Sequence, residues 1–275
     1  MSTGNTPPEL NTIDIEIDGD VATMTLNRPE SFNAMSPEMI AELPVAFAWF
    51  ADISDVRAII ITGAGMAFCA GGDVNWFKKG IEDPDIDIVA AVRQGAETLH
   101  LGIVELQRIG VPVIAAINGP AAGAGMSLAL ACDIRICSDS DSTFFACAYG
   151  RIGASPDGGM TYFLPRVVGP SRALEILIND PNIRPEDALA DRLVTEVVPA
   201  DELMDRAREK AAKLATKSPY YIRNAKMLIH GSLDHTITEH LQIERHAIAE
   251  SMATEDLLAA VTAFLEGGKA EFQCK

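Results

Sequence analysis

The hydrophobic and polar positions in the first quarter of the chain predict a β-hairpin, a helix and a buried strand. Apolar and polar residues alternate over Ile13–Ile17 and Val21–Leu26, on either side of an Asp-Gly-Asp turn. A serine and a proline then supply a capping side chain and a first-turn residue for a helix over Glu38–Phe50. The largely apolar run Arg57–Thr62 is typical of a strand that is buried on both faces.

The middle of the chain alternates between strand and helix patterns. An acidic segment around Pro84 predicts an exposed and mobile loop ahead of the first long helix. The elements expected here are a glycine-rich loop over Gly63–Gly72, a helix over about Ile88–Ile109, a strand over Val113–Asn118, a short helix near Ala124–Cys132 and a strand over Ile134–Cys137. This alternation indicates an α/β core with crossover connections.

From about Ser171 onward the pattern becomes mostly helical. Leu193–Val198 is the last strand that the sequence predicts, and three or four helices follow between Ala200 and Phe272. The last of these helices has an apolar face with no predicted partner in the chain, which favours self-association. We therefore divide the chain into a flexible tail over residues 1–10, a core domain over residues 11–199 and a helical C-terminal oligomerisation subdomain over residues 200–275.

Composition and charge exclude several classes of protein. Hydrophobic residues make up 48% and charged residues 22% of the chain, as in a globular protein. The net charge of −17 argues against binding to nucleic acid or to anionic membranes. The long uncharged run between Arg108 and Asp133 contains two prolines and four glycines, so we interpret it as a buried strand and helix and not as a membrane span. The first ten residues lack the apolar stretch of a signal peptide, so we expect a cytoplasmic protein.

The motifs for common cofactors are incomplete. The dinucleotide fingerprint needs a third glycine where this chain has Phe68 in one candidate and Leu128 in the other, and no phosphate loop of the nucleotide hydrolases occurs. The histidines between positions 230 and 246 lack the HExxH spacing of a zinc site. The five cysteines form no CxxC pair and are expected to be buried, reduced thiols. We expect no metal and no cofactor.

Ser127 lies one residue short of a complete nucleophile motif. The segment Gly125–Ala129 would match GxSxG if its last residue were glycine. Ser127 also falls well inside the predicted helix and not at a strand-to-helix corner. A buried or helix-face serine is therefore favoured over a catalytic nucleophile.

Four stretches of the chain resemble the crotonase superfamily, the enoyl-CoA hydratase/isomerase group. They are LNRPESFNAM at Leu26–Met35, AFCAGGDVNWF at Ala67–Phe77, the glycine-rich segment Pro112–Ile136 and RIGASPDGGMTYFLPRVVG at Arg151–Gly169, and the resemblance continues to Thr262–Phe272. It implies an α/β fold built as a crotonase-like spiral of β-β-α units with a helical C-terminal subdomain. It also implies an acyl-CoA thioester substrate, with coenzyme A as part of that substrate, and a homotrimer or a dimer of trimers.

The resemblance assigns roles to residues in and around the two glycine-rich turns. The backbone N–H groups of Gly72 and Ala124 match the pair that holds the thioester oxygen of an enolate in relatives. Arg28 matches a position near the phosphates of coenzyme A, and Phe264 and Lys269 match positions that reach the coenzyme A of a neighbouring subunit. The residues implied along the coenzyme A arm are Ala70, Gly72, Asp73, Val74 and Asn75.

The acid and base positions depart from the hydratase pattern. Where hydratases carry two catalytic glutamates, this chain has Ser127 and Tyr149, and a tyrosine is a poor base near neutral pH. Asp157 aligns instead with an aspartate that moves a proton along the acyl chain in the isomerase branch. The same aspartate could simply cap a helix that starts at Gly158.

Four functional interpretations follow from this departure. An enoyl-CoA isomerase with Asp157 as base and acid is preferred. The alternatives are a hydratase that uses other residues, a non-catalytic acyl-CoA binding protein and a thioester hydrolase. We expect the acyl specificity to depend on the surroundings of Trp76, Phe77, Phe145 and Tyr149.

Overall fold

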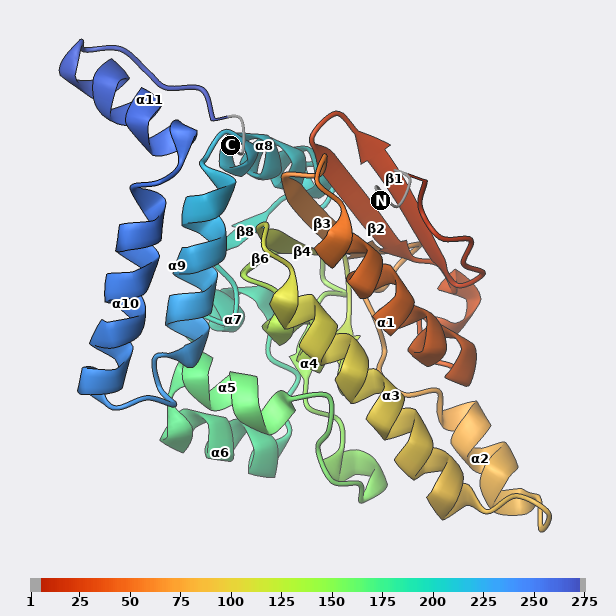
Figure 1. Cartoon of the computed structure of the whole chain (residues 1–275). Helices are drawn as coiled ribbons and strands as arrows, with labels where there is room; N and C mark the ends of the chain where they lie inside the picture. Colours follow the sequence, from red (N-terminus) through yellow and green to blue (C-terminus); the bar gives the residue numbers. More distant parts are fainter. Residues whose placement is uncertain (1–5, 273–275) are drawn as a thin grey trace.

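A six-stranded sheet lies at the centre of the computed structural model, which describes residues 6–272 (Figure 1). Its strand order is β1-β2-β3-β4-β6-β8, and every neighbouring pair is parallel except the antiparallel hairpin β1-β2. A second, two-stranded parallel sheet pairs β5 with β7. The strands are β1 (Ile13–Asp18), β2 (Val21–Leu26), β3 (Ala58–Gly63), β4 (Val113–Ile117), β5 (Ala121–Ala122), β6 (Ile134–Ser138), β7 (Phe145–Ala146) and β8 (Glu196–Val198).

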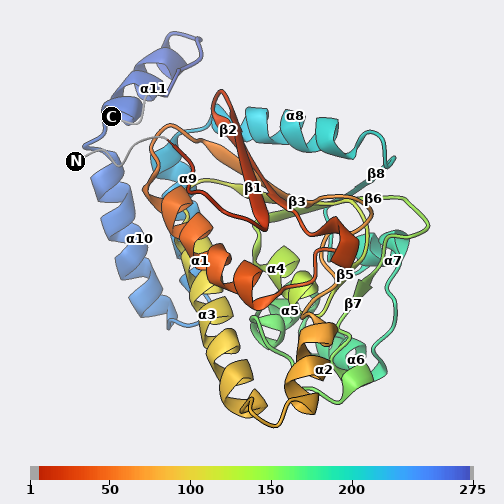
Figure 2. The same cartoon turned by 90° about the vertical axis from the view of Figure 1, so that its right-hand side faces the viewer.

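Helices cover both faces of the large sheet and extend beyond it (Figure 2). Short 3₁₀ turns occur at Pro29–Ser31 and Gly150–Ile152. The α-helices are α1 (Pro37–Asp52), α2 (Val74–Glu82), α3 (Ile88–Arg108), α4 (Ala124–Ala131), α5 (Met160–Val168), α6 (Pro170–Asn179), α7 (Pro185–Ala190), α8 (Leu203–Ala215), α9 (Pro219–Gly231), α10 (Ile237–Ser251) and α11 (Glu255–Leu265).

The burial of strand β3 on both faces explains why its sequence is largely apolar. Successive side chains of a strand point to opposite faces, so Ile59 and Ile61 enter the large core while Ile60 faces the other side. Helix α8 covers that other side with small residues, among them Ala207 and Ala211. Both faces of β3 are therefore dry, and each of its residues is buried.

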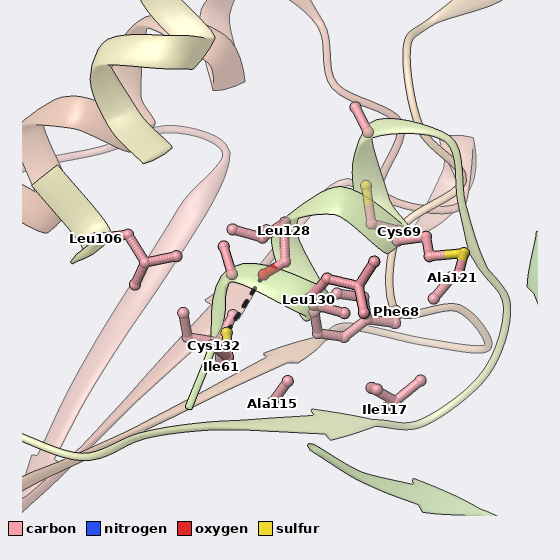
Figure 3. Close-up of a cluster of buried hydrophobic side chains, with 14 of the residues drawn as sticks. Ile61, Phe68, Cys69, Leu106, Ala115, Ile117, Ala121, Leu128, Leu130 and Cys132 are labelled. Atoms are coloured by element: carbon pink, nitrogen blue, oxygen red, sulfur yellow. Dashed lines mark hydrogen bonds between the residues drawn. The ribbon is translucent and has the colours of Figure 1, made fainter. Parts of the chain in front are cut away.

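Helix α4 is buried on every side. All eight of its residues are buried, and a helix with apolar residues on every side is stable only inside a protein. Figure 3 shows Leu130 beside Phe68, with Ala115 and Ile117 of β4 beneath them. The uncharged run of the sequence is thus strand β4 followed by helix α4, as predicted. Among residues 6–272, no helix is both long enough and apolar enough to cross a membrane.

The structure confirms most of the predicted elements. The hairpin, helices α1, α3 and α4, strands β3, β4 and β6 and four helices after residue 200 all occur, and the Ser36 side chain accepts the N–H of Met39 as a cap. The strand expected over Leu193–Val198 is shorter, because β8 begins at Glu196. Helix α2 was not predicted. Its start is fixed by Asp73, whose Oδ1 accepts the N–H groups of Asn75 and Trp76.

Some expectations for flexible and terminal segments stay predictions. The acidic loop around Pro84 is exposed, as expected, and its mobility stays a prediction. Residues 1–5 of the predicted tail and Cys274 lie outside the described residues. Cys69, Cys132, Cys137 and Cys147 are buried free thiols.

The C-terminal helices differ in how they contact the sheet. Helix α8 packs against β2, β3, β4 and β6, whereas α11 stands away from the body of the chain in both views (Figures 1 and 2). The division at residue 200 and the oligomerisation role of the last segment stay predictions.

Two helical glycines provide a matched test of the packing around α4. An added Cβ at Gly125 would lie 2.2 Å from the backbone oxygen of Cys69, whereas one at Gly95 in α3 would meet nothing within 4 Å. We expect Gly125→Ala to lower the free energy of unfolding by about 2–3 kcal/mol. We expect Gly95→Ala to raise it by about 0.5–1 kcal/mol, because alanine favours a helix more than glycine. Urea unfolding measures both, and equal effects would contradict the close approach at Gly125.

Candidate active site

Two loops that leave neighbouring parallel strands are joined by backbone hydrogen bonds. One follows β3 and the other follows β4. The Cys69 N–H donates to the Pro120 oxygen over 3.1 Å, and the Ala122 N–H donates to the Cys69 oxygen over 2.9 Å. Because ligands of open α/β sheets bind beyond the carboxyl ends of the strands, this junction is where a site is expected.

Glycines allow the two loops to approach each other this closely. Gly71 has φ +95°, and a Cβ there would lie 2.8 Å from the Ala122 oxygen. Gly123 has φ +53°, in the left-handed region that favours glycine. Within residues 6–272, the N–H groups of Gly72 and Ala124 donate to no acceptor. Ala124 also begins α4, where the helix dipole is positive, so both donors are suited to a ligand oxygen.

An ion pair fixes the first of these loops. Asp73 Oδ2 lies 3.2 Å from both terminal nitrogens of Arg28, and the two side chains are 20% and 12% exposed. The Met35 N–H donates to the Gly71 oxygen over 2.7 Å. Arg28 is therefore held by a carboxylate beside the loop, and its predicted approach to the phosphates of coenzyme A stays a prediction.

The predicted arm-binding stretch lies at the surface beside the buried Cys69. Ala70, Val74 and Asn75 are exposed, and Gly72 and Asp73 are half-buried. The Phe77 ring closes the inner side, since its nearest carbon is 3.0 Å from the place of a Cβ at Gly72. That this stretch binds the coenzyme A arm stays a prediction.

Three further predicted residues form one hydrogen-bonded group. Ser127 is fully buried on α4, one turn beyond Ala124. Its Oγ lies 3.0 Å from the Asp157 backbone oxygen and 3.3 Å from the Tyr149 hydroxyl. The Tyr149 hydroxyl donates to Asp157 Oδ1 over 2.8 Å. The structure thus places Asp157 next to the helix that supplies one of the two free donors.

Tyr149 is a hydrogen-bond donor here. Burial, and then the negative charge of Asp157, raise the pKa of Tyr149 well above its ordinary value. A protonated phenol occupies Oδ1 of Asp157. Among the described residues, no group donates a hydrogen bond to Oδ2.

The Asp157 side chain does not cap the helix that follows it. Helix α5 begins at Met160, two residues later than expected, and Gly159 is its N-cap with no side-chain cap. Asp157 contributes its backbone oxygen, which accepts the Met160 N–H over 3.1 Å. Its carboxylate is instead directed to Tyr149.

Ser127 lacks the partner that a nucleophile needs. Its hydroxyl lies within hydrogen-bond distance of the backbone oxygens of Gly123 and Asp157. Its side-chain neighbour is Tyr149, whose pKa is raised. An activated serine requires an adjacent base. Ser127 therefore joins α4 to the segment that carries Asp157.

His100 also contacts the segment that carries Asp157, although no motif in the sequence points to it. It projects from α3, and its Nε2 accepts the N–H of Gly158 over 3.3 Å. The two residues are 58 positions apart in the chain, so no local pattern links them.

Phe264 and Lys269 do not reach this site within one chain. Phe264 is 82% exposed on α11, and Lys269 follows that helix and is also exposed. Helix α11 lies at the opposite end of the molecule from α2 in both views (Figures 1 and 2). Phe145, expected near the acyl group, is buried in the core on β7.

The fold is that of an α/β protein with two unused backbone donors beyond the carboxyl ends of its strands, and the comparisons with known proteins identify its family. The model of the family described as enoyl-CoA hydratase/isomerase matches residues 16–275. The chain belongs to this family, within the crotonase superfamily.

Named relatives include both hydratases and isomerases. The chain is 35% identical over 266 residues to a short-chain-enoyl-CoA hydratase of Clostridium acetobutylicum, covering 96% of this chain and 98% of the relative. It is 33% identical over 259 residues to a 1,2-epoxyphenylacetyl-CoA isomerase of Escherichia coli, covering 94% and 97%.

The solved structures support the fold. An enoyl-CoA hydratase from Bacillus anthracis superimposes with a TM-score of 0.88 at 30% identity, covering 96% of this chain and 100% of that one. The predicted crotonase-like fold is thereby confirmed.

The hydrogen-bonded group predicts how Tyr149 titrates. A free phenol ionises at about pH 10. The difference in tyrosinate absorbance between wild type and Tyr149→Phe should therefore show no step near that pH. Replacing Asp157 with asparagine removes the negative charge that disfavours tyrosinate, so the pKa of Tyr149 should fall in that variant. A Tyr149 step near pH 10 in wild type, unchanged by Asp157→Asn, would contradict the arrangement.

Proposed function

We propose that this protein is an enoyl-CoA isomerase that moves a proton along the acyl chain with Asp157. The family acts on acyl-CoA thioesters. The observation that carries the isomerase proposal is the single carboxylate at Asp157, with Oδ1 bound to Tyr149 and Oδ2 available. By the family resemblance, Ser127 and Tyr149 occupy the positions at which hydratases carry their two catalytic glutamates.

The proposed reaction begins with the thioester oxygen at the N–H groups of Gly72 and Ala124. Asp157 Oδ2 takes a proton from a carbon of the acyl chain, and the electron pair of that C–H bond shifts toward the thioester to form an enolate. The two N–H groups stabilise the oxyanion without reorganising. Asp157 then returns the proton to a carbon farther along the chain. The enolate electrons re-form the thioester carbonyl and the double bond shifts toward it, so the double bond moves and no water is consumed.

Tyr149 and Ser127 support this step without exchanging protons with the substrate. Tyr149 stays protonated and holds Oδ1, which directs Oδ2 as the basic atom. Ser127 ties the Asp157 backbone to α4, one turn from Ala124. The base and one oxyanion donor are thereby connected through a single buried helix.

The second candidate is a hydratase that uses other residues. It is favoured by the hydratase name of the Clostridium acetobutylicum relative at 35% identity. Water addition to crotonyl-CoA, measured as the loss of enoyl absorbance, distinguishes the hydratase from the isomerase. A non-catalytic binding protein would bind thioesters and turn over none of a broad acyl panel, and a thioester hydrolase would release free thiol.

We also propose that the chain works as a homotrimer or a dimer of trimers, without a cofactor. Exposed apolar side chains on the last helix support self-association, with Phe264 at 82% and Leu265 at 79% exposure. In such an assembly Phe264 and Lys269 would approach the coenzyme A of a neighbouring subunit.

Proton exchange tests the role of Asp157. Enoyl-CoA substrates incubated in D₂O with wild type should take up deuterium on the acyl chain, and Asp157→Asn should slow this by about 10²–10⁴-fold, the usual contribution of a general base. Mass spectrometry of the recovered thioester gives the rate, and Asp18→Asn in the exposed hairpin is the control. Equal exchange rates for wild type and Asp157→Asn would show that Asp157 is not the base. Crotonyl-CoA hydration at the rate of a glutamate-bearing hydratase would favour the second candidate.

A proline at position 124 tests the oxyanion donor directly. Ala124 is the first residue of α4, where proline is tolerated, and its N–H makes no hydrogen bond among the described residues. Ala124→Pro should therefore fold and lose about 10²–10³-fold in kcat. Ala124→Ser keeps the N–H and should stay close to wild type. Steady-state kinetics on a turned-over enoyl-CoA measure both, and equal activity of the proline and serine variants would disprove the donor.

A further inference from the structure

We propose that His100 is a positioning residue for Asp157, an inference that rests on the proposed function. The side chain comes from α3, while Asp157 lies in the loop before α5. Their link is the peptide bond between Asp157 and Gly158, which has a hydrogen-bond partner at each end.

One end of this peptide bond is its carbonyl oxygen. The Asp157 oxygen lies 3.0 Å from Ser127 Oγ and 3.2 Å from the Tyr149 hydroxyl, and it accepts the Met160 N–H. Ser127 is fully buried on α4. The carbonyl is therefore held from the interior of the protein.

The other end is the N–H of Gly158, which is held by His100. His100 Nε2 accepts this N–H over 3.3 Å. The acceptor is thus a side-chain nitrogen from a different helix, while the carbonyl at the other end of the peptide bond is held from α4. Leu99, the residue before His100, is buried and packs 3.6 Å from the place of a Cβ at Gly158, so α3 itself is fixed against the turn.

The turn at Gly158 and Gly159 needs such partners because its two glycines do not restrict the backbone to one conformation. Gly158 and Gly159 have φ of +59° and +86°, and glycine reaches many other conformations at little cost. Rotation of the Asp157–Gly158 peptide plane would move the Asp157 carbonyl oxygen away from Ser127 and from the Tyr149 hydroxyl, the same hydroxyl that holds the carboxylate at Oδ1. The hydrogen bonds from α4 at the oxygen and to α3 at the nitrogen hold that plane from both sides.

Loss of the His100 acceptor should therefore reduce turnover more than binding. The thioester oxygen binds at Gly72 and Ala124, which His100 does not contact, so KM should change little. Misplacement of a reacting group by about 1 Å can cost about 100-fold in rate. The expected pattern is a lower kcat at nearly constant KM.

Glutamine and methionine at position 100 form a matched pair for this test. The two side chains are similar in length and volume, and glutamine offers a strong acceptor whereas methionine does not. His100→Met should lower kcat for deuterium exchange by about 10–100-fold, and His100→Gln should recover to within about threefold of wild type. His246→Met, at an exposed histidine on α10, is the control.

The amide signal of Gly158 in NMR provides a readout that does not depend on activity. We expect its chemical shift to move in His100→Met, through loss of the hydrogen bond, and to return toward the wild-type value in His100→Gln. Unchanged kcat in His100→Met, or equal losses in the methionine and glutamine variants, would overturn the positioning role.

The two proposals fail separately. If Asp157→Asn exchanges deuterium as fast as wild type, the proposed function is wrong and the role of His100 in catalysis is wrong with it. If Asp157→Asn is slow and His100→Met is as fast as wild type, the function stands and the inference about His100 is wrong.

Discussion

The site depends on the close backbone contact between the loop after β3 and the turn after β4. Two hydrogen bonds between Cys69 and the turn residues Pro120 and Ala122 hold the loops together. The contact requires the absence of side chains, because a Cβ at Gly71 or Gly125 would collide with backbone oxygens. The hydrogen bonds of this contact leave the N–H groups of Gly72 and Ala124 without an acceptor among the described residues, so the same geometry that closes the core leaves two backbone donors unused.

Helix α4 transmits this geometry to the rest of the site. It is buried on all sides, so it cannot shift without disturbing the core between β4 and α3. Its first residue supplies a free N–H, and Ser127, one turn later, holds the backbone of Asp157. The candidate base and an unused backbone donor are therefore placed by one rigid element, although they lie more than thirty residues apart in the chain.

Charge plays a local part in a strongly acidic protein. Arg28 is paired with Asp73, which also caps α2, so this cation stabilises the loop that carries Gly72. Asp157 is held by a protonated tyrosine and not by a cation. The negative charge of Asp157 helps to keep the Tyr149 phenol protonated. The tyrosine is therefore a hydrogen-bond donor, and the carboxylate is the acceptor.

The sequence by itself determined the family, the alternation of strands and helices and the two glycine turns, because these follow from local periodicity and from short motifs. It also singled out Ser127, Tyr149 and Asp157. Tertiary structure decided what those residues do: the Asp157 side chain bonds to Tyr149 and does not cap α5. It also brought in His100. A hydrogen bond between residues far apart in the chain depends on how helices pack, which no local pattern encodes.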